Sequence, residues 1–465
     1  MRAVSTACRF ILFASLLPVL LRSLHYKIRE RYCECEAGLL IEQANSRTEK
    51  VNTRCCVVGG GPAGMIAGFL LARAGVDVVV LEKHSDFLRD FRGDTIHPST
   101  LELMYELGIL DEFLRRPHQE LPQFGGQIED VTVIVADFSH LPTHCKFIAL
   151  MPQWDFLNFI AEKAKAYPQF HLRMESEVTE LIEENGRIVG VRAKTSQGIL
   201  EVRADLTLGT DGRHSIVRAK AGLEVIDLGA PIDVLWMRLT REPSDPDQTL
   251  GRFRAGKILV MLNRADYWQC AYVIPKGDLE VIRQKGLAAF RDDIVSVAPF
   301  LRGRTDELKD WNDIKLLTVA VDRLRQWWRS GLLCLGDSAH AMSPVGGVGI
   351  NLAIQDAVAA ANILVEPLLR GAVRDEQLRA VQERREYPTR MTQRFQVFAH
   401  KHLLGPALSQ KTQTRRLPLP FMLLRRFPVL RRIPARMLGL GFRPEHVRTP
   451  ETQVRIATMN GAWLP

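Results

Sequence analysis

Three glycines in the first part of the chain follow a short apolar run in a pattern that suits phosphate binding. Residues 55–58 predict a buried strand, and Gly59, Gly61 and Gly64 after it form the pattern G-x-G-x-x-G. In this pattern the first glycine makes a tight turn, the second lets the backbone approach a pyrophosphate, and the third lets a helix pack on the strand. We therefore predict a dinucleotide site, which by this motif alone could hold FAD or NAD.

The residues after the glycines strengthen this prediction. Residues 65–74 are expected to form a helix whose N-terminus faces the phosphates, and residues 76–81 a second parallel strand. Glu82 ends that strand, where its carboxylate can accept hydrogen bonds from a ribose diol. This order of strand, helix, strand and acid predicts dinucleotide binding more specifically than the glycine pattern does alone.

An acid and a glycine follow another apolar strand in the middle of the chain. A strand is predicted up to about Thr210, with a turn at Asp211 and Gly212 and a helix from about Ser215. An acid beside a helix start suits a ligand that carries hydroxyls and phosphates, although Asp-Gly alone is also an ordinary turn.

A third segment combines an acid with a glycine-rich loop. Residues 332–335 predict a buried strand, and Asp337 stands at its carboxyl end, where open α/β sheets bind ligands. The loop over residues 344–349 is rich in glycine and leads into a helix predicted from about residue 352. Bare amides and the helix dipole suit the pyrimidine edge of a flavin ring, which becomes negative on reduction.

Over residues 52–400, the three motifs in this order resemble the group A flavoprotein monooxygenases of the para-hydroxybenzoate hydroxylase type. The resemblance implies bound FAD, NAD(P)H as a transient co-substrate, and O2. Reduced flavin would react with O2 to give a C4a-hydroperoxide, and the enzyme would hydroxylate an aromatic or other electron-rich small molecule. Neither a metal nor a particular catalytic residue is implied.

The resemblance also implies which residues contact the ADP half of the cofactor and the chain that links it to the flavin. Gly59, Gly61, Gly64 and Glu82 would hold the ADP half of FAD. Asp337 would bind the ribityl chain or the adjoining phosphates.

The remaining contacts implied by the resemblance concern the flavin and NAD(P)H. The residues that would line the isoalloxazine ring are Pro344, Gly347, Gly349 and Asn351. Arg92 would approach the cofactor and Gln153 would face the flavin, while Asp211 with Gly212 would serve both FAD and NAD(P)H. The sequence departs from the family at Val348, where a glutamine is more usual, so donors from this loop would be backbone amides.

Other functions on the same fold stay open at this point. A flavin reductase, an epoxidase or a halogenase could act on an isoprenoid or quinone-like substrate, but the Trp-x-Trp-x-Ile-Pro motif of halogenases is absent. A non-catalytic FAD-binding regulatory protein is the alternative from a different class.

The elements between the motifs divide the chain into regions. Residues 51–224 and 331–400 are expected to form a discontinuous FAD-binding domain, and residues 225–330 read as the strands of an inserted sheet. Residues 95–145 would contribute to the substrate pocket. The fold class predicted is α/β: a Rossmann-like FAD-binding domain with an inserted, largely antiparallel β-sheet substrate domain and C-terminal helices.

Some large side chains in the predicted strands of the insert could line the pocket or lie in the core. They are Trp236, Met237, Trp268 and Tyr272. The strand pattern alone leaves both interpretations open.

Composition and charge exclude several classes of protein. Apolar residues make up 46% and charged residues 25% of the chain, which excludes disordered and low-complexity proteins. The formal charge of +9 resides in the two ends, because residues 55–400 contain 41 basic and 46 acidic residues. The body therefore lacks the basic bias of a nucleic-acid groove.

The ends of the chain differ from its body. Residues 1–50 form an extension whose apolar run is shorter than the about 20 residues that span a bilayer, so it reads as a plain extension or a weak membrane anchor. Residues 401–465 carry twelve basic and two acidic residues among prolines, which favours short helices. These helices could form a C-terminal cap or contact an anionic membrane peripherally.

The cysteines favour a reducing compartment. The eight cysteines have neither a disulfide framework nor zinc-ligand spacing. We expect a cytoplasmic protein, in contact with the inner face of a membrane at most peripherally, that binds a small aromatic-type substrate and no nucleic acid. A homodimer is left open.

Overall fold

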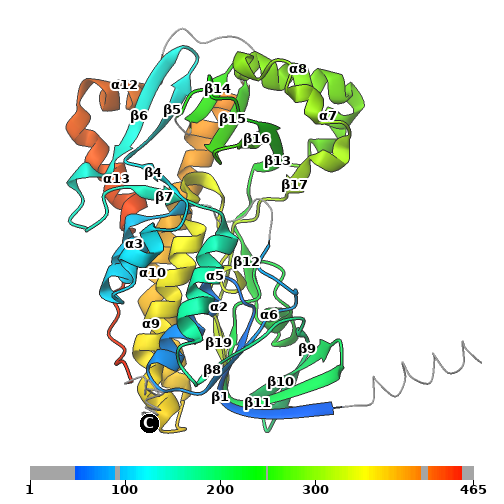
Figure 1. Cartoon of the computed structure of the whole chain (residues 1–465), viewed down its shortest axis with the longest axis vertical. Helices are drawn as coiled ribbons and strands as arrows, with labels where there is room; N and C mark the ends of the chain where they lie inside the picture. Colours follow the sequence, from blue (N-terminus) through cyan, green and yellow to red (C-terminus); the bar gives the residue numbers. More distant parts are fainter. Residues whose placement is uncertain (1–47, 89–94, 248–249, 410–416, 453–465) are drawn as a thin grey trace, which may run out of the picture.

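The computed structural model describes residues 48–88, 95–247, 250–409 and 417–452 (Figure 1). Residues 1–47, which make up most of the N-terminal extension, lie outside the described residues, and so does Arg92. The expectations for an anchor or a plain extension, and for an arginine beside the cofactor, therefore stay predictions.

Among the described residues, eight strands form the larger sheet. Its path is β19 (Trp328–Arg329), β20 (Leu332–Cys334), β11 (Gly198–Gly209), β1 (Thr48–Val58), β2 (Val78–Leu81) and β8 (Phe170–Arg173). β10 (Arg187–Thr195) pairs with β11, and β9 (Glu177–Glu184) pairs with β10. β20, β11, β1, β2 and β8 pair in parallel, so their carboxyl ends meet at one edge.

The strand predicted at residues 55–58 is longer in the structure. β1 begins at Thr48, and its first half pairs in parallel with β11. That half is polar and largely exposed, so it lacks the apolar run by which the buried half was recognised.

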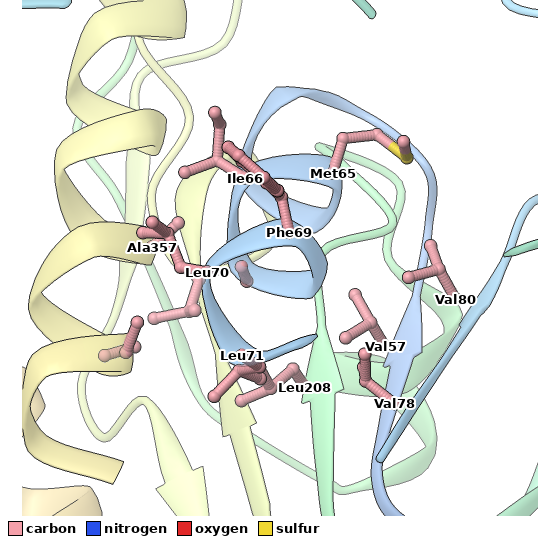
Figure 2. Close-up of a cluster of buried hydrophobic side chains, with 14 of the residues drawn as sticks. Val57, Met65, Ile66, Phe69, Leu70, Leu71, Val78, Val80, Leu208 and Ala357 are labelled. Atoms are coloured by element: carbon pink, nitrogen blue, oxygen red, sulfur yellow. The ribbon is translucent and has the colours of Figure 1, made fainter. Parts of the chain in front are cut away.

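Helix α2 (Pro62–Arg73) lies between the larger sheet and α9 (Gly349–Leu369), as Figure 2 shows. Ile66 and Leu70 lie toward Ala357 of α9, and Leu71 lies beside Leu208 of β11. Nearly all of α2 is buried, because its side chains are apolar on every face. The helix begins three residues before the predicted start, since proline suits the first turn.

A second sheet of seven strands, counted over the described residues, forms the other half of the molecule (Figure 1). Its order is β17 (Lys315–Leu317), β13 (Ile232–Thr240), β16 (Tyr267–Pro275), β15 (Lys257–Asn263), β14 (Leu250–Arg254), β5 (Gln123–Ile128) and β6 (Val131–Asp137). The strands are antiparallel except for the β14–β5 pair. β5 and β6 come from the segment expected to contribute to the substrate pocket.

The large side chains of this second sheet lie on two opposite faces, because successive residues of a strand alternate between the faces. Trp236 faces the cavity between the two halves of the molecule. Met237, Trp268 and Tyr272 pack on the opposite face against α8 (Leu287–Val297). Successive side chains of a strand point to opposite faces, so residues 236 and 237 cannot share one environment.

Shorter elements complete the two halves. Small sheets join β3 (Thr95–Ile96), β7 (Ile148–Leu150) and β4 (Gln119–Leu121), and join β12 (Val225–Asp227) with β18 (Asp322–Leu324). The shorter helices are α3 (Pro98–Glu106), α4 (Leu110–Leu114), α5 (Gln153–Ala164), α6 (Ile216–Lys220) and α7 (Leu279–Lys285). The predicted fold class is confirmed by this arrangement.

The last helices run back across both halves of the molecule. They are α10 (Asp375–Ala399), a π-helical turn at His400–Leu404, α11 (Gly405–Ser409), α12 (Leu419–Arg426) and α13 (Arg432–Gly439). α12 and α13 lie beside β6 (Figure 1) and leave Arg425 and Arg426 exposed. The segment Val345–Leu369, which contains α9, is long and apolar enough to cross a membrane, but 83% of its most apolar window is buried, as in a core helix.

A buried ion-pair network joins the end of β20 to the helices behind it. Asp356 on α9 accepts from His340 at 2.6 Å and from Arg385 on α10 at 2.8 Å. A third hydrogen bond, from the backbone amide of Gly336, fixes the turn before Asp337. Burial alone raises the pKa of Asp356, but His340 and Arg385 bring it below the ordinary value, so the carboxylate is ionised.

Replacing Arg385 by methionine should destabilise the protein by about 3–5 kcal/mol, because it leaves a buried carboxylate without its cation. The matched control is Arg370→Met, since Arg370 pairs with Glu366 and both side chains are more than 70% exposed. That change should cost less than about 1 kcal/mol. Urea unfolding followed by circular dichroism measures both, and equal losses would contradict a special role for the buried network.

His97 fastens the start of α3 to α13. Its Nδ1 donates to the carbonyl oxygen of Leu438 at 2.7 Å, and its backbone amide donates to Asn351 at 2.8 Å. Burial lowers the pKa of His97 to about 4, so the ring is neutral near pH 7. Its imidazole ring packs in the interior and, among the described residues, makes a single hydrogen bond, the one to Leu438.

This buried histidine makes the stability pH-dependent. In the unfolded chain its imidazole takes up a proton below its ordinary pKa of 6.5, whereas in the folded chain it does so only near pH 4. The unfolded state therefore binds more protons between these values, and stability falls as the pH drops from about 6.5 to 4, by up to about 3 kcal/mol. His97→Asn keeps a donor without the titration, so its melting temperature should fall less over this range; a fall as steep as that of the wild type would contradict the assignment.

Candidate functional site

One cavity of about 950 Å³ joins the two halves of the molecule. It begins at the first glycine motif and the end of β2, passes the turns after β11 and β20, and ends between the second sheet and the C-terminal helices. Its volume is at the upper end of the range for small-molecule sites, roughly 300–1,000 Å³.

The three glycines of the first motif have different roles in the structure. A methyl group on Gly64 would lie 2.0 Å from the carbonyl oxygen of Gly59, and one on Gly59 would lie 2.6 Å from the carbonyl oxygen of Thr210. A methyl group on Gly61 would meet nothing within 4 Å, because Gly61 faces the cavity. Gly59 and Gly64 are therefore required by the fold, whereas Gly61 leaves room for a ligand.

The N-terminus of α2 opens on the same space. The helix has no side-chain cap and no acidic residue in its first turn, so free amides and the positive end of the dipole face the cavity. Glu82 lines the cavity across from it and accepts from the backbone amides of Gly60 at 2.9 Å and His84 at 3.1 Å. These bonds fix the position of the carboxylate at the wall of the cavity.

Thr210, which the sequence did not single out, links the first and second motifs. Its hydroxyl lies 2.9 Å from the carbonyl oxygen of Val58 and 2.8 Å from that of Gly59. A hydroxyl at the end of β11, directly before Asp211, is the signal that could have identified it.

The acid and glycine of the second motif both line the cavity. Asp211 accepts from the hydroxyl of Ser215 at 2.5 Å and from the amide of Val217 at 3.1 Å, so it also holds the start of α6. Burial raises the pKa of Asp211. Gly212 has a φ of +83°, which favours glycine at this turn.

Asp337 of the third motif also lines the cavity and is 35% exposed. The guanidinium of Arg213 lies 4.0 Å from its carboxylate and donates to the carbonyl oxygen of Thr318. Arg213 was not predicted from the sequence. An anion and a cation at one wall suit a ligand with both hydroxyls and phosphates.

The glycine-rich loop bounds the middle of the cavity. Pro344, Gly347 and Gly349 line it, and the helix after the loop begins at Gly349 rather than near residue 352. A methyl group on Gly347 would lie 2.3 Å from the hydroxyl oxygen of Thr95, so the loop needs glycine to approach β3. The N-terminus of α9 has no side-chain cap.

Asn351 does not line the cavity. Its amide oxygen accepts from His97 and Thr100, each at 2.8 Å, and its nitrogen donates to the carbonyl oxygens of Thr95 and Gly347. It positions the loop and β3, because all its polar atoms are bound to protein. The predicted direct contact with the flavin ring is not supported by this placement.

Helix α10 holds the other end of the loop. Gln396 accepts from the amide of Ser343 at 3.1 Å and donates to its carbonyl oxygen at 2.8 Å. The hydroxyl of Ser343 lies 2.8 Å from Nε2 of His400, at the start of the π-helical turn. Among the other predicted residues, Gln153 lines the cavity at the start of α5, while Gly64 lies beneath it.

The far part of the cavity is an apolar chamber. One wall is the face of the second sheet with Val234, Trp236 and Phe253. The opposite wall includes Phe421 of α12 and Leu438 of α13. The sequence predicted the basic surface of these helices but not that their inner side lines the cavity. Their prolines and paired arginines interrupt the regular apolar spacing by which such a face is recognised.

FAD fits the near part of this cavity by the chemistry of its residues. An uncapped helix start beside Gly61 suits a pyrophosphate, and Glu82 suits a ribose. The bare loop before α9 leaves space for a flat ring at the point where the apolar chamber begins.

Comparison with known proteins identifies the family. Residues 52–395 match the family described as FAD binding domain. The chain is 35% identical over 394 residues to 6-methylpretetramide 4-monooxygenase of Streptomyces rimosus, covering 82% of this chain and 92% of the relative. It is 26% identical to para-nitrophenol 4-monooxygenase of a Pseudomonas species, covering 68% of this chain and 78% of the relative.

A solved structure shows the same fold. It is anhydrotetracycline hydroxylase OxyS of Streptomyces rimosus, which is 21% identical and superposes with a TM-score of 0.66 over 84% of this chain and 76% of its own. The resemblance found in the three motifs is confirmed: the chain belongs to the FAD binding domain family and is an FAD-dependent monooxygenase of group A.

Proposed function

We propose that this enzyme hydroxylates a polycyclic aromatic compound in the apolar chamber, with electrons from NAD(P)H and one oxygen atom of O2. The observation that carries the proposal is the single cavity that runs from the dinucleotide motif into the chamber. Bound FAD supplies the redox chemistry that passes electrons from NAD(P)H to O2.

The near part of the cavity would hold FAD through the three motifs. The first-turn amides of α2 and the space at Gly61 would receive the pyrophosphate, and Glu82 would bind the ribose of the adenosine. Asp337 would bind the ribityl hydroxyls, with Arg213 balancing its charge. Asp211 and Gly212 would contact FAD and, in turn, NAD(P)H.

The loop before α9 would bound the flavin ring. Pro344, Gly347 and Gly349 present backbone and little side chain there, and Gln153 faces the same space. The uncapped helix dipole would favour negative charge on the ring, and therefore its reduced state. Arg92 is proposed to approach the cofactor as in the family.

The chamber would bind the substrate by burial of apolar surface. Trp236, Phe253 and Phe421 provide large apolar walls that suit stacked rings. Closure by α12 and α13 would exclude water from the reacting atoms. The named substrates of the relatives, among them 6-methylpretetramide and para-nitrophenol, support an aromatic substrate for this chain.

Gly61→Val should give a folded protein without FAD, because the added side chain would extend into ligand space and its Cβ would meet no protein atom within 4 Å. Gly64→Val is the contrasting variant and should fail to fold, since its side chain would overlap the backbone of Gly59. Circular dichroism and the flavin absorbance of the purified proteins measure both. A yellow Gly61→Val protein with full FAD content would contradict the cofactor site.

The reaction is tested with the FAD-loaded wild-type enzyme. It should oxidise NADPH or NADH several-fold faster with 2-hydroxyanthracene than without it, and release a hydroxylated product. Phenol is the matched single-ring control and should stimulate much less, because it buries little surface in the chamber. Oxidation that no aromatic compound stimulates would contradict the proposal.

A further inference from the structure

The outer side of the C-terminal helices carries a cluster of exposed apolar side chains. Over the described residues, fifteen large apolar side chains are exposed, and six of them fall between residues 419 and 433. These six, each more than 40% exposed, form the outer patch: Leu419, Met422, Leu423, Phe427, Val429 and Ile433. Single exposed apolar residues are ordinary on a protein surface, whereas a cluster of them marks a surface that binds something.

Helix α12 is apolar on two sides. Leu419, Met422 and Leu423 are three and four residues apart, so they share one side of the helix, and that side is exposed. Phe421, on the other side, lines the cavity. The cavity wall explains the inner apolar side of α12, but the outer one stays exposed over the described part of the chain.

Arginines surround the outer patch, and its sequence contains no acidic residue. Residues 417–444 include six arginines and neither aspartate nor glutamate. Those that are exposed between residues 425 and 436 are Arg425, Arg426, Arg432 and Arg436. Within the described ranges these four have no carboxylate partner: Arg426 lies over the ring of Phe427, and Arg432 contacts His140. The surface is therefore positively charged as well as apolar.

This combination matches the chemistry of an anionic lipid surface. Apolar side chains can enter the boundary between headgroups and acyl chains, while neighbouring guanidinium groups bind the headgroup phosphates. A second copy of the chain fits less well. A twofold interface would bring the arginines of both copies together without a carboxylate between them.

The distribution of charge would orient the molecule toward such a surface. Residues 401–465 carry twelve basic and two acidic residues, whereas residues 55–400 carry 41 basic and 46 acidic ones. An anionic membrane therefore attracts the C-terminal region and repels the body. Helices α12 and α13 lie beside β6 at the margin of the molecule (Figure 1), where a flat surface can reach them.

We infer that the outer patch docks the enzyme on an anionic membrane, with its apolar side chains at the headgroup boundary and the exposed arginines on lipid phosphates. The inference goes beyond the proposed function, because it states where the enzyme binds and does not depend on the compound in the chamber. Since α12 and α13 also bound the chamber, docking places the chamber next to lipid.

Two variants alter the outer patch and leave the cavity wall unchanged. Leu423→Glu places a charge on the exposed side of α12. The double variant Arg425→Gln with Arg426→Gln removes two exposed cations. None of these three residues lines the cavity.

The matched controls lie on α7, across the second sheet from α12 (Figure 1). Val281→Glu adds the same charge at an exposed apolar position, and Arg283→Gln with Lys285→Gln removes two exposed cations. Circular dichroism and flavin absorbance verify the fold and the FAD content of every variant.

Binding is measured by co-sedimentation of the FAD-loaded full-length protein with vesicles of phosphatidylcholine, alone or with about one third phosphatidylglycerol. The wild type and the α7 controls should bind the anionic vesicles roughly tenfold or more tightly than the neutral ones, and added salt should weaken this binding. Each α12 variant should lose roughly tenfold or more of the affinity. Residues 1–47 are present in every sample, so a difference between variants reports on the outer patch.

Three results would overturn the inference. The first is a wild-type protein that stays in the supernatant with anionic vesicles. The second is equal affinity of the wild type and the α12 variants, or an equal loss in the α7 controls, since the outer patch would then not be the binding surface. The third is a wild-type dimer that does not bind vesicles and that the α12 variants convert to monomers, which would identify the patch as a contact between copies. The proposed function stands in all three cases, because it is measured in solution without lipid.

Discussion

The parallel pairing of β1, β11 and β20 is the constraint on which the rest of the structure depends. Because neighbouring parallel strands end at one edge of the sheet, the three motifs meet there although Gly59 and Asp337 lie far apart in the chain. Thr210 and the buried carboxylate of Asp356 fix the turns at this edge. Strand order therefore brings the three motifs together at this edge, where we propose that FAD binds.

The second sheet and the last helices extend the cavity at this edge into the apolar chamber. The sheet presents one apolar face to the cavity and packs the other against α8, while α12 and α13 cover the opposite side. Asn351 and Gln396 hold the loop between the two parts, since each bonds its backbone. The same loop therefore borders both the part of the cavity proposed for FAD and the apolar chamber.

Much of this arrangement could be predicted from the sequence where the signal is local. The glycine spacing, the apolar runs and the acids at strand ends identify the family and the edge of the sheet. Contacts made by distant segments leave no such pattern: the inner side of α12 is masked by prolines and arginines, and Arg213 follows an ordinary turn. Alternation shows that Trp236 and Met237 face opposite ways, but it does not tell which of the two faces the cavity.

The most direct test of the central claim, that one cavity brings FAD and an aromatic substrate together for oxygen transfer, is isotope labelling. The FAD-loaded enzyme is supplied with NAD(P)H, 2-hydroxyanthracene and oxygen gas enriched in the heavy isotope, and the product is analysed by mass spectrometry. We predict that the product gains one heavy oxygen atom from the gas. A product that takes its oxygen from water, or NAD(P)H oxidation that yields only hydrogen peroxide, would contradict the claim.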